Sequence, residues 1–262
     1  ELTVLMEPGQ DPHSYQSSAR DLGTAAKAHV IFVSGFGLEE SLLAELQGAA
    51  EKVPLIEVSA GIEPIAAQES EEQEAEEEEG GHDHAEDPHV WFDVAKVERW
   101  THNIEAVLGQ LDPNHLSKYE ANAAAYDAEL EQLDEFIRES VAAIPAANRK
   151  LVTNHDSFAY FAKAYGFEVV GTVIPSFSTG SEPSASDLRD LIEIINNQKV
   201  PAIFIEATVS DKLAEVVSEE TGASTHQLYS GAIGAPGSGT DSYIGMMRAN
   251  VETIRDALRN GD

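Results

Sequence analysis

Cysteine is absent from this sequence of 262 residues, which excludes disulfides, thiolate metal ligands and thiol catalysis. Basic residues are scarce as well, with 16 Lys and Arg against 47 Asp and Glu, so the formal net charge is -31. This charge repels nucleic acid and anionic membranes and favours cations, so we predict no nucleic-acid partner. No apolar run approaches the roughly 18 residues that a membrane-spanning helix needs. Any site for a borderline transition metal must therefore consist of histidine and carboxylate.

Short apolar runs alternate with segments of helical periodicity in both halves of the chain. This pattern predicts an α/β fold with parallel sheets and right-handed crossovers. The first half predicts strands at 2–6, 30–33 and 53–58 and helices at 17–28 and 38–50. The second half predicts strands at 150–153, 168–173, 202–205 and 225–228 and helices at 157–165, 186–197, 211–221 and 242–258. We therefore expect two lobes, each with a parallel sheet flanked by helices.

The longest regular element expected from the sequence lies between these halves. Apolar residues recur every three or four positions from Leu116 to Ile144, and Pro145 ends the pattern. About thirty residues at roughly 1.5 Å each form a helix about 45 Å long, enough to join two lobes. We predict an N-terminal lobe at 1–112, one long rigid linking helix at 113–145 and a C-terminal lobe at 146–262. Because the chain opens inside a predicted strand without a signal segment, we expect its start to be missing.

Residues 59–87 show no periodicity, and eight of the eleven residues from 69 to 79 are glutamate. Such a composition buries too little apolar surface to order itself, so we expect a mobile acidic loop. His82 and His84 lie within it. They are either accessory contacts that capture metal transiently or solvated side chains.

Four side chains outside that loop follow predicted strands or precede predicted helices: His13, His89, His155 and Asp241. His13 and His89 each follow an Asp-Pro pair, and proline keeps the preceding residue out of the helical region, so stiff turns present both imidazoles. In open α/β sheets ligands bind beyond the carboxyl ends of the strands. Three imidazoles and a carboxylate suit zinc. Manganese is a second candidate, although it prefers oxygen ligands.

Each candidate also has a purely structural explanation. Asp241 fits equally well as the N-cap of the last helix. His13 and His89 fit as loop side chains, and His155 fits as part of a helix cap. Glu206 ends a predicted strand. Three roles are open to it: a metal ligand, an acceptor that orients a histidine, or a partner for another donor. We favour the orienting role. Four further histidines have no supporting context: His29, His102, His115 and His226.

Four blocks of sequence, in order, resemble the signatures of the ZnuA-like solute-binding proteins of zinc and manganese ABC importers. The blocks are residues 5–15, 87–93, 154–161 and 241–247, with further similarity at 184–188 and 200–206. The resemblance implies two α/β lobes joined by a long rigid helix, an acidic loop that contains histidine, and a metal ion held between the lobes. By motif match its ligands are His13, His89, His155 and Asp241.

The resemblance further implies a binding protein rather than an enzyme, located outside the cytoplasmic membrane in the periplasm or lipid-anchored at the cell surface. Its partner is an ABC permease in the membrane, and we expect a monomer. Manganese-binding relatives often carry glutamate in place of His155, which favours Zn²⁺ over Mn²⁺ as the transported ion. A zinc-dependent hydrolase is the rival from another class, but a fourth protein ligand leaves no position for an activated water. For a third alternative, an adhesion or structural protein, the sequence offers no apolar patch.

Overall fold

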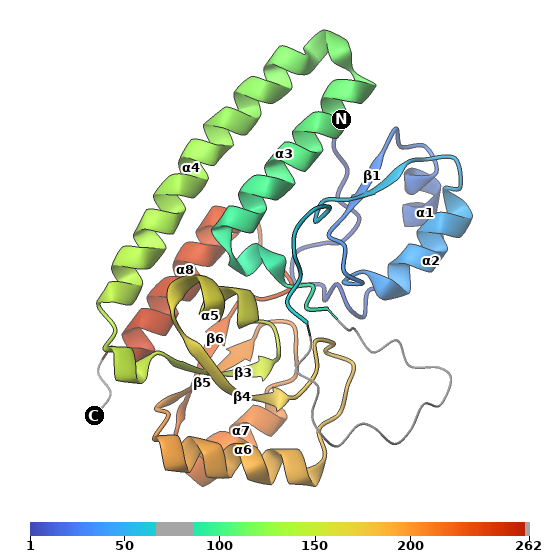
Figure 1. The fold of residues 1–262 in the computed structure, drawn as a ribbon. Coiled ribbons are helices and arrows are strands. Elements are labelled where there is room, and N and C mark those ends of the chain that lie inside the picture. The colour runs from blue at the N-terminus through green and yellow to red at the C-terminus, as the bar shows by residue number, and fades with distance from the viewer. Residues whose placement is uncertain (67–85, 260–262) are drawn as a thin grey trace.

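Two parallel sheets organise the molecule, each in its own lobe (Figure 1). The computed structural model describes residues 1–66 and 86–259. In the N-terminal lobe β1 (Ile31–Val33) pairs with β2 (Leu55–Glu57), and α1 (Ala19–Ala25) and α2 (Glu40–Ala49) accompany them. Seven buried side chains of this lobe form a cluster of their own: Tyr15, Ala25, Ile31, Val33, Leu42, Leu46 and Ala50.

The C-terminal lobe contains a four-stranded parallel sheet in the order β4-β3-β5-β6. Its strands are β3 (Lys150–His155), β4 (Glu168–Ile174), β5 (Ala202–Glu206) and β6 (Ser224–Leu228). Its helices are α5 (Ala159–Tyr165), α6 (Ala185–Gln198), α7 (Lys212–Thr221) and α8 (Tyr243–Leu258). Helices connect successive strands because parallel strands need crossovers. The α/β fold class predicted from the sequence is therefore confirmed.

A long helical hairpin stands beside the two sheets and projects past both lobes in Figure 1. Asp93 caps α3 (Val94–Leu111) by accepting a hydrogen bond from the backbone N–H of Ala95 at 3.1 Å. A short 3₁₀ turn, η2 (Pro113–His115), then leads into α4 (Leu116–Ala142), which has 27 residues. The apolar side chains of α3 and α4 share one buried cluster with α5 and α8. The predicted long helix exists, and its buried side chains run from Ala123 to Val141.

The predicted strand at 2–6 is wrong. Within the described part of the chain β1 and β2 pair only with each other, and residues 2–6 belong to no strand. Leu2 and Val4 are 88% and 73% exposed. Apolar and β-branched residues favour a strand only where a partner edge and a packing surface are available. The other predicted elements form, with ends that differ from the predictions by a few residues.

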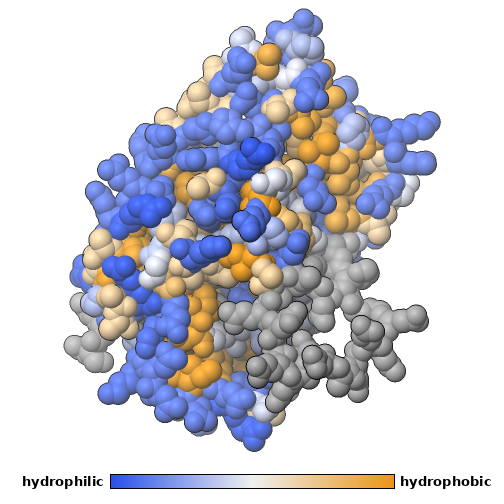
Figure 2. Space-filling view, in the orientation of Figure 1, coloured by the Kyte–Doolittle hydropathy of each residue, from blue (hydrophilic) through white to orange (hydrophobic). Residues whose placement is uncertain are grey.

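The ends of the predicted acidic loop meet at the base of the N-terminal lobe. Ala66 and Glu86 form an antiparallel bridge, and the backbone N–H of Asp87 donates to the carbonyl of Ile65 at 2.8 Å. The glutamate run, together with His82 and His84, falls outside the described residues. Hydrophilic residues cover most of the face in Figure 2, and hydrophobic ones gather over the N-terminal lobe and low on the C-terminal lobe. Among the described helices none combines the length and apolarity needed to cross a bilayer.

Candidate metal centre

A carboxylate fixes the turn that presents His13. Asp11 Oδ1 accepts the backbone N–H of His13 at 3.1 Å, which closes the Asx-turn typical of aspartate two residues ahead. Its second oxygen accepts the hydroxyls of Ser14 at 2.9 Å and of Thr179, from the C-terminal lobe, at 2.6 Å. His13 is 8% exposed. The turn is thus tied to both lobes.

The turn before η1 (Val90–Phe92) presents His89 in the same way, with a stronger constraint. Asp87 Oδ1 accepts both the backbone N–H of His89 at 2.9 Å and its Nδ1 at 2.7 Å. Both side chains are fully buried. The Tyr160 hydroxyl donates to the Asp87 carbonyl at 3.0 Å and accepts the N–H of Ile65 at 3.0 Å. Because an ionised Asp87 carboxylate can only accept a hydrogen bond, the Nδ1 of a neutral His89 ring carries the proton and its Nε2 carries a lone pair.

His155 is the last residue of β3 rather than a loop residue. Thr153 of β3 pairs with Phe204 of β5, so the parallel register sets His155 beside Glu206, the last residue of β5. Glu206 Oε1 accepts the backbone N–H of His155 at 3.1 Å and also its Nδ1, while Oε2 accepts the hydroxyl of Ser230. The Nε2 of a neutral His155 therefore carries a lone pair as well.

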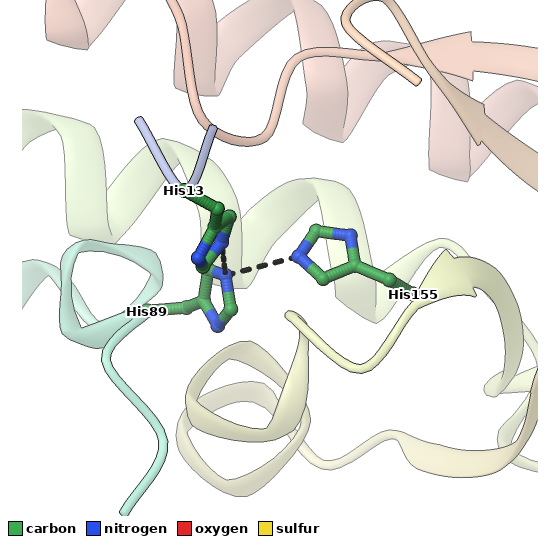
Figure 3. Close-up of side chains that lie close together, drawn as sticks. All are labelled: His13, His89 and His155. Carbon is green, nitrogen blue, oxygen red and sulfur yellow. Dashed lines mark hydrogen bonds between the residues drawn. The ribbon is translucent and has the colours of Figure 1, made fainter. Parts of the chain in front are cut away.

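The three imidazoles converge although they come from distant parts of the chain (Figure 3). The Nε2 of His89 lies 3.2 Å from that of His13 and 3.0 Å from that of His155. A tetrahedral zinc ion with Zn–N bonds of roughly 2.0 to 2.1 Å separates its nitrogen ligands by about 3.3 Å, close to these spacings. All three histidines are buried, and they form the one group of potential metal ligands found within 4.8 Å among residues 1–66 and 86–259.

Three carboxylates lie near this group, and two of them, Asp87 and Glu206, are buried. Burial raises the pKa of Asp87 to about 7, against the lowering effect of the His89 backbone N–H. Burial also raises the pKa of the neighbouring Asp156 to about 6, and repulsion from Asp87 adds to the rise. Burial acts on Glu206 in the same direction, but the charge of His155 and hydrogen bonds from His155 and Ser230 outweigh it and lower the pKa of Glu206. A cation at the imidazoles would favour the ionised form of each acid.

Asp241 stands apart from the histidines. It is exposed, and its Oδ2 accepts the backbone N–H of Gly237 at 2.7 Å. The N-cap of α8 is Ser242, whose hydroxyl accepts the N–H of Gly245 at 3.1 Å, so Asp241 does not cap that helix. The structure thus brings together three of the four predicted ligands and leaves Asp241 outside the group. The four histidines without sequence context are not members of the group either.

Sequence reasoning missed the contact between Asp87 and the His89 ring. A signal was present, because aspartate two residues before histidine, as in both Asp-Pro-His turns, favours an Asx-turn that brings the carboxylate back to the histidine. The contact between Glu206 and His155 was among the predicted alternatives, and the structure shows it.

Two α/β lobes with three buried imidazoles between them, two of which are oriented by carboxylates, are the architecture of a metal-binding, substrate-binding protein. The family model described as "Zinc-uptake complex component A periplasmic" (ZnuA) matches residues 1–257. The chain therefore belongs to the ZnuA family, the substrate-binding components of ABC metal importers. It is a binding protein located outside the cytoplasmic membrane and not an enzyme, as predicted from the resemblance.

The relatives of this chain are named for different metals. The zinc-binding protein TroA of Treponema pallidum is 35% identical, over 98% of this chain and 81% of the relative. The manganese-binding lipoprotein MntA of Halalkalibacterium halodurans is 32% identical over 98% and 81%, and the iron-binding protein YfeA of Yersinia pestis is 32% identical over 95% and 76%. The solved structure of TroA superposes with a TM-score of 0.83 at 33% identity, covering 97% of this chain and 89% of TroA.

Proposed function

We propose that this protein captures Zn²⁺ outside the cytoplasmic membrane and delivers it to an ABC permease. The observation that carries the proposal is the convergence of three buried Nε2 atoms at spacings of 3.0 and 3.2 Å. Two of these imidazoles hold their Nδ1 protons against carboxylates, an arrangement that fixes ring orientation and raises ligand basicity in metal sites. The ion is the transported cargo, and no chemical step is required of it.

Zinc is favoured over manganese by the chemistry of the donors. Three imidazole nitrogens suit a borderline cation, whereas Mn²⁺ prefers oxygen ligands. The spacing of the nitrogens matches a tetrahedral ion with short bonds, which is the usual geometry of zinc. Manganese remains the alternative ion, since MntA carries it in its name.

Asp241 is the proposed fourth ligand. Asp241 lies two residues before the start of α8, in the same loop as Gly237, and its carboxylate accepts the backbone N–H of Gly237. To reach the ion it must exchange that hydrogen bond for the metal, which a loop of small residues permits. Its negative charge would offset part of the charge of Zn²⁺ in a buried site.

The remaining features fit a carrier. One chain supplies all four proposed ligands, so we propose a monomer that docks on a membrane permease. A net charge of -31 favours the approach of cations. We propose that His82 and His84 are accessory metal contacts and that the main site binds its ion without them.

Calorimetric titration of Zn²⁺ into metal-stripped protein tests the proposal. We expect one ion per chain, with affinity above that for Mn²⁺ in a competition titration. Replacing residues 70–85 by a short Gly-Ser linker, which keeps Glu86 and its bridge to Ala66, should leave the stoichiometry unchanged. His155→Ala should abolish the tight site. Unchanged zinc affinity in that variant would refute the assignment, and stronger binding of Mn²⁺ by the wild type would favour the alternative ion.

A further inference from the structure

Both ends of the loop that carries Asp241 are hydrogen-bonded to one residue, Trp91. The indole Nε1 of Trp91 donates to the carbonyl of Ser230, where the loop begins, at 3.1 Å. The carbonyl of Trp91 accepts the hydroxyl of Tyr243, where the loop ends, at 2.7 Å. Trp91 is 8% exposed, so neither contact competes freely with water.

The same residue belongs to the turn that holds His89. Trp91 lies two positions after His89, and the two rings pack edge to face with centroids 5.3 Å apart. Ser230 also reaches the other side of the site, because its hydroxyl donates to the Glu206 carboxylate that orients His155. The loop from 230 to 243 is therefore connected at its ends to the supports of two of the three histidines.

The hydrogen bonds printed for the interior of the loop in the described part of the chain join its own residues: the backbone N–H of Gly234 donates to the carbonyl of Thr240 at 2.8 Å, and that of Ser238 to the carbonyl of Ala235 at 3.0 Å. Gly237 and Gly239 adopt φ values of 79° and 83°, in the left-handed region that glycine enters at no steric cost. Asp241 is exposed and bonded to Gly237 within the loop. With both ends fixed, a shift of the carboxylate toward the imidazoles requires rearrangement of the interior alone. Releasing one end would enlarge the conformational space from which the carboxylate must be recruited.

We infer that Trp91 is a positioning residue for the fourth ligand: by holding both ends of the 230–243 loop, it sets how long Asp241 stays on the bound ion. The inference rests on the proposed function. It assigns Trp91 a role in retention of the metal rather than in ligation, since the indole supplies no lone pair to a cation. Its effect should appear in the rate of metal release and should depend on Asp241.

Stopped-flow measurement of Zn²⁺ release into excess chelator tests this role. Trp91→Phe keeps an aromatic ring and removes the Nε1 donor, and Tyr243→Phe removes only the hydroxyl. Each should speed release about two- to tenfold, the effect expected for loss of one neutral hydrogen bond. In an Asp241→Ala background neither substitution should change the rate further, because the loop then carries no ligand.

Trp100→Phe is the matched control. Trp100 lies on α3, and its ring centroid is 6.3 Å from that of Trp91. Its Nε1 donates to the Ser59 hydroxyl at 2.9 Å and not to the loop, so removal of this donor should leave release unchanged while it changes the same aromatic contact. Thermal unfolding of the metal-free variants shows whether each one folds. If Trp91→Phe does not fold, the release rate of Tyr243→Phe tests the inference. Wild-type release rates in both Phe variants, or equal acceleration with and without Asp241, would overturn the inference. Absence of one-to-one zinc binding in the wild type would instead overturn the proposed function.

Discussion

The three histidines and the loop that carries Asp241 are built in opposite ways. His89 and His155 are 0% and 1% exposed, and each is held at two atoms by one carboxylate. Asp241 is exposed and bonded only to a neighbour within its own loop among the contacts that the described residues make. A rigid set of nitrogens fixes where an ion sits and which ion fits. An adaptable carboxylate can decide how long the ion stays, which is the property a carrier must adjust before delivery.

The largest effect should follow loss of the central imidazole. His89→Ala removes the ring that contacts both other histidines, so the remaining pair cannot form a tetrahedral site. We expect zinc affinity, measured by chelator competition, to fall more than about a hundredfold, beyond the usual effect of changes outside the ligand shell. His226→Ala is the control, because that ring bonds Ser224 at 2.8 Å on β6. A comparable loss of zinc affinity in His226→Ala would show that the effect of His89→Ala is not specific to the histidine cluster.

Acidification should act in opposite directions on the metal-free and the zinc-loaded protein. The folded-state pKa of Asp87, about 7, lies above its ordinary 3.8. The protonated carboxyl therefore contributes stability that is full below about pH 4 and is lost as the pH rises through about 7. Bound zinc needs neutral imidazoles, which gain protons below about pH 6.5 in unperturbed histidine. In melting experiments, the metal-free protein should gain stability from about pH 8 to about pH 5.5, while the increment added by zinc shrinks.

An increment that grows on acidification would contradict ligation by imidazole. Asp87→Asn supplies a second check, because it removes the titrating group. The metal-free variant should lose part of the pH dependence seen in the wild type.

Weakening the support of one imidazole should cost less than removing a ligand. Glu206→Gln replaces the charged acceptor of His155 Nδ1 by a neutral amide. Zinc affinity should fall about ten- to hundredfold, as for comparable contacts in other metal sites. Glu39→Gln is the matched control, since Glu39 is also buried and accepts a backbone N–H, from Ser34 at 2.7 Å. Equal losses in both variants would point to a general effect of buried carboxylates rather than to orientation of His155.

The smallest effect should come from the loop. Asp241→Ala should weaken zinc binding roughly tenfold, mostly through faster release, because three nitrogens still hold the ion. Asp211→Ala is the control: Asp211 is exposed and precedes α7 as Asp241 precedes the first residues of α8. Full affinity and an unchanged release rate in the Asp241 variant would remove Asp241 from the site.

Local sequence determined much of this protein. Periodicity predicted the α/β elements and the long helix because apolar spacing follows the geometry of helix and strand directly. The absence of cysteine limited the ligands to histidine and carboxylate. The two Asp-Pro-His turns indicated where two of the imidazoles are presented, since both turns close locally on their own aspartate.

Only the tertiary structure decided what depends on contacts between distant residues. The register of β3 against β5 sets Glu206 on His155 and thereby its tautomer, and no local pattern encodes that pairing. Strand character at residues 2–6 led to no strand, because pairing needs an edge that the local sequence does not supply. The position of Asp241 outside the cluster likewise follows from a loop that closes on Gly237. The sequence specified the ligand types, and packing between the lobes decided which of them meet.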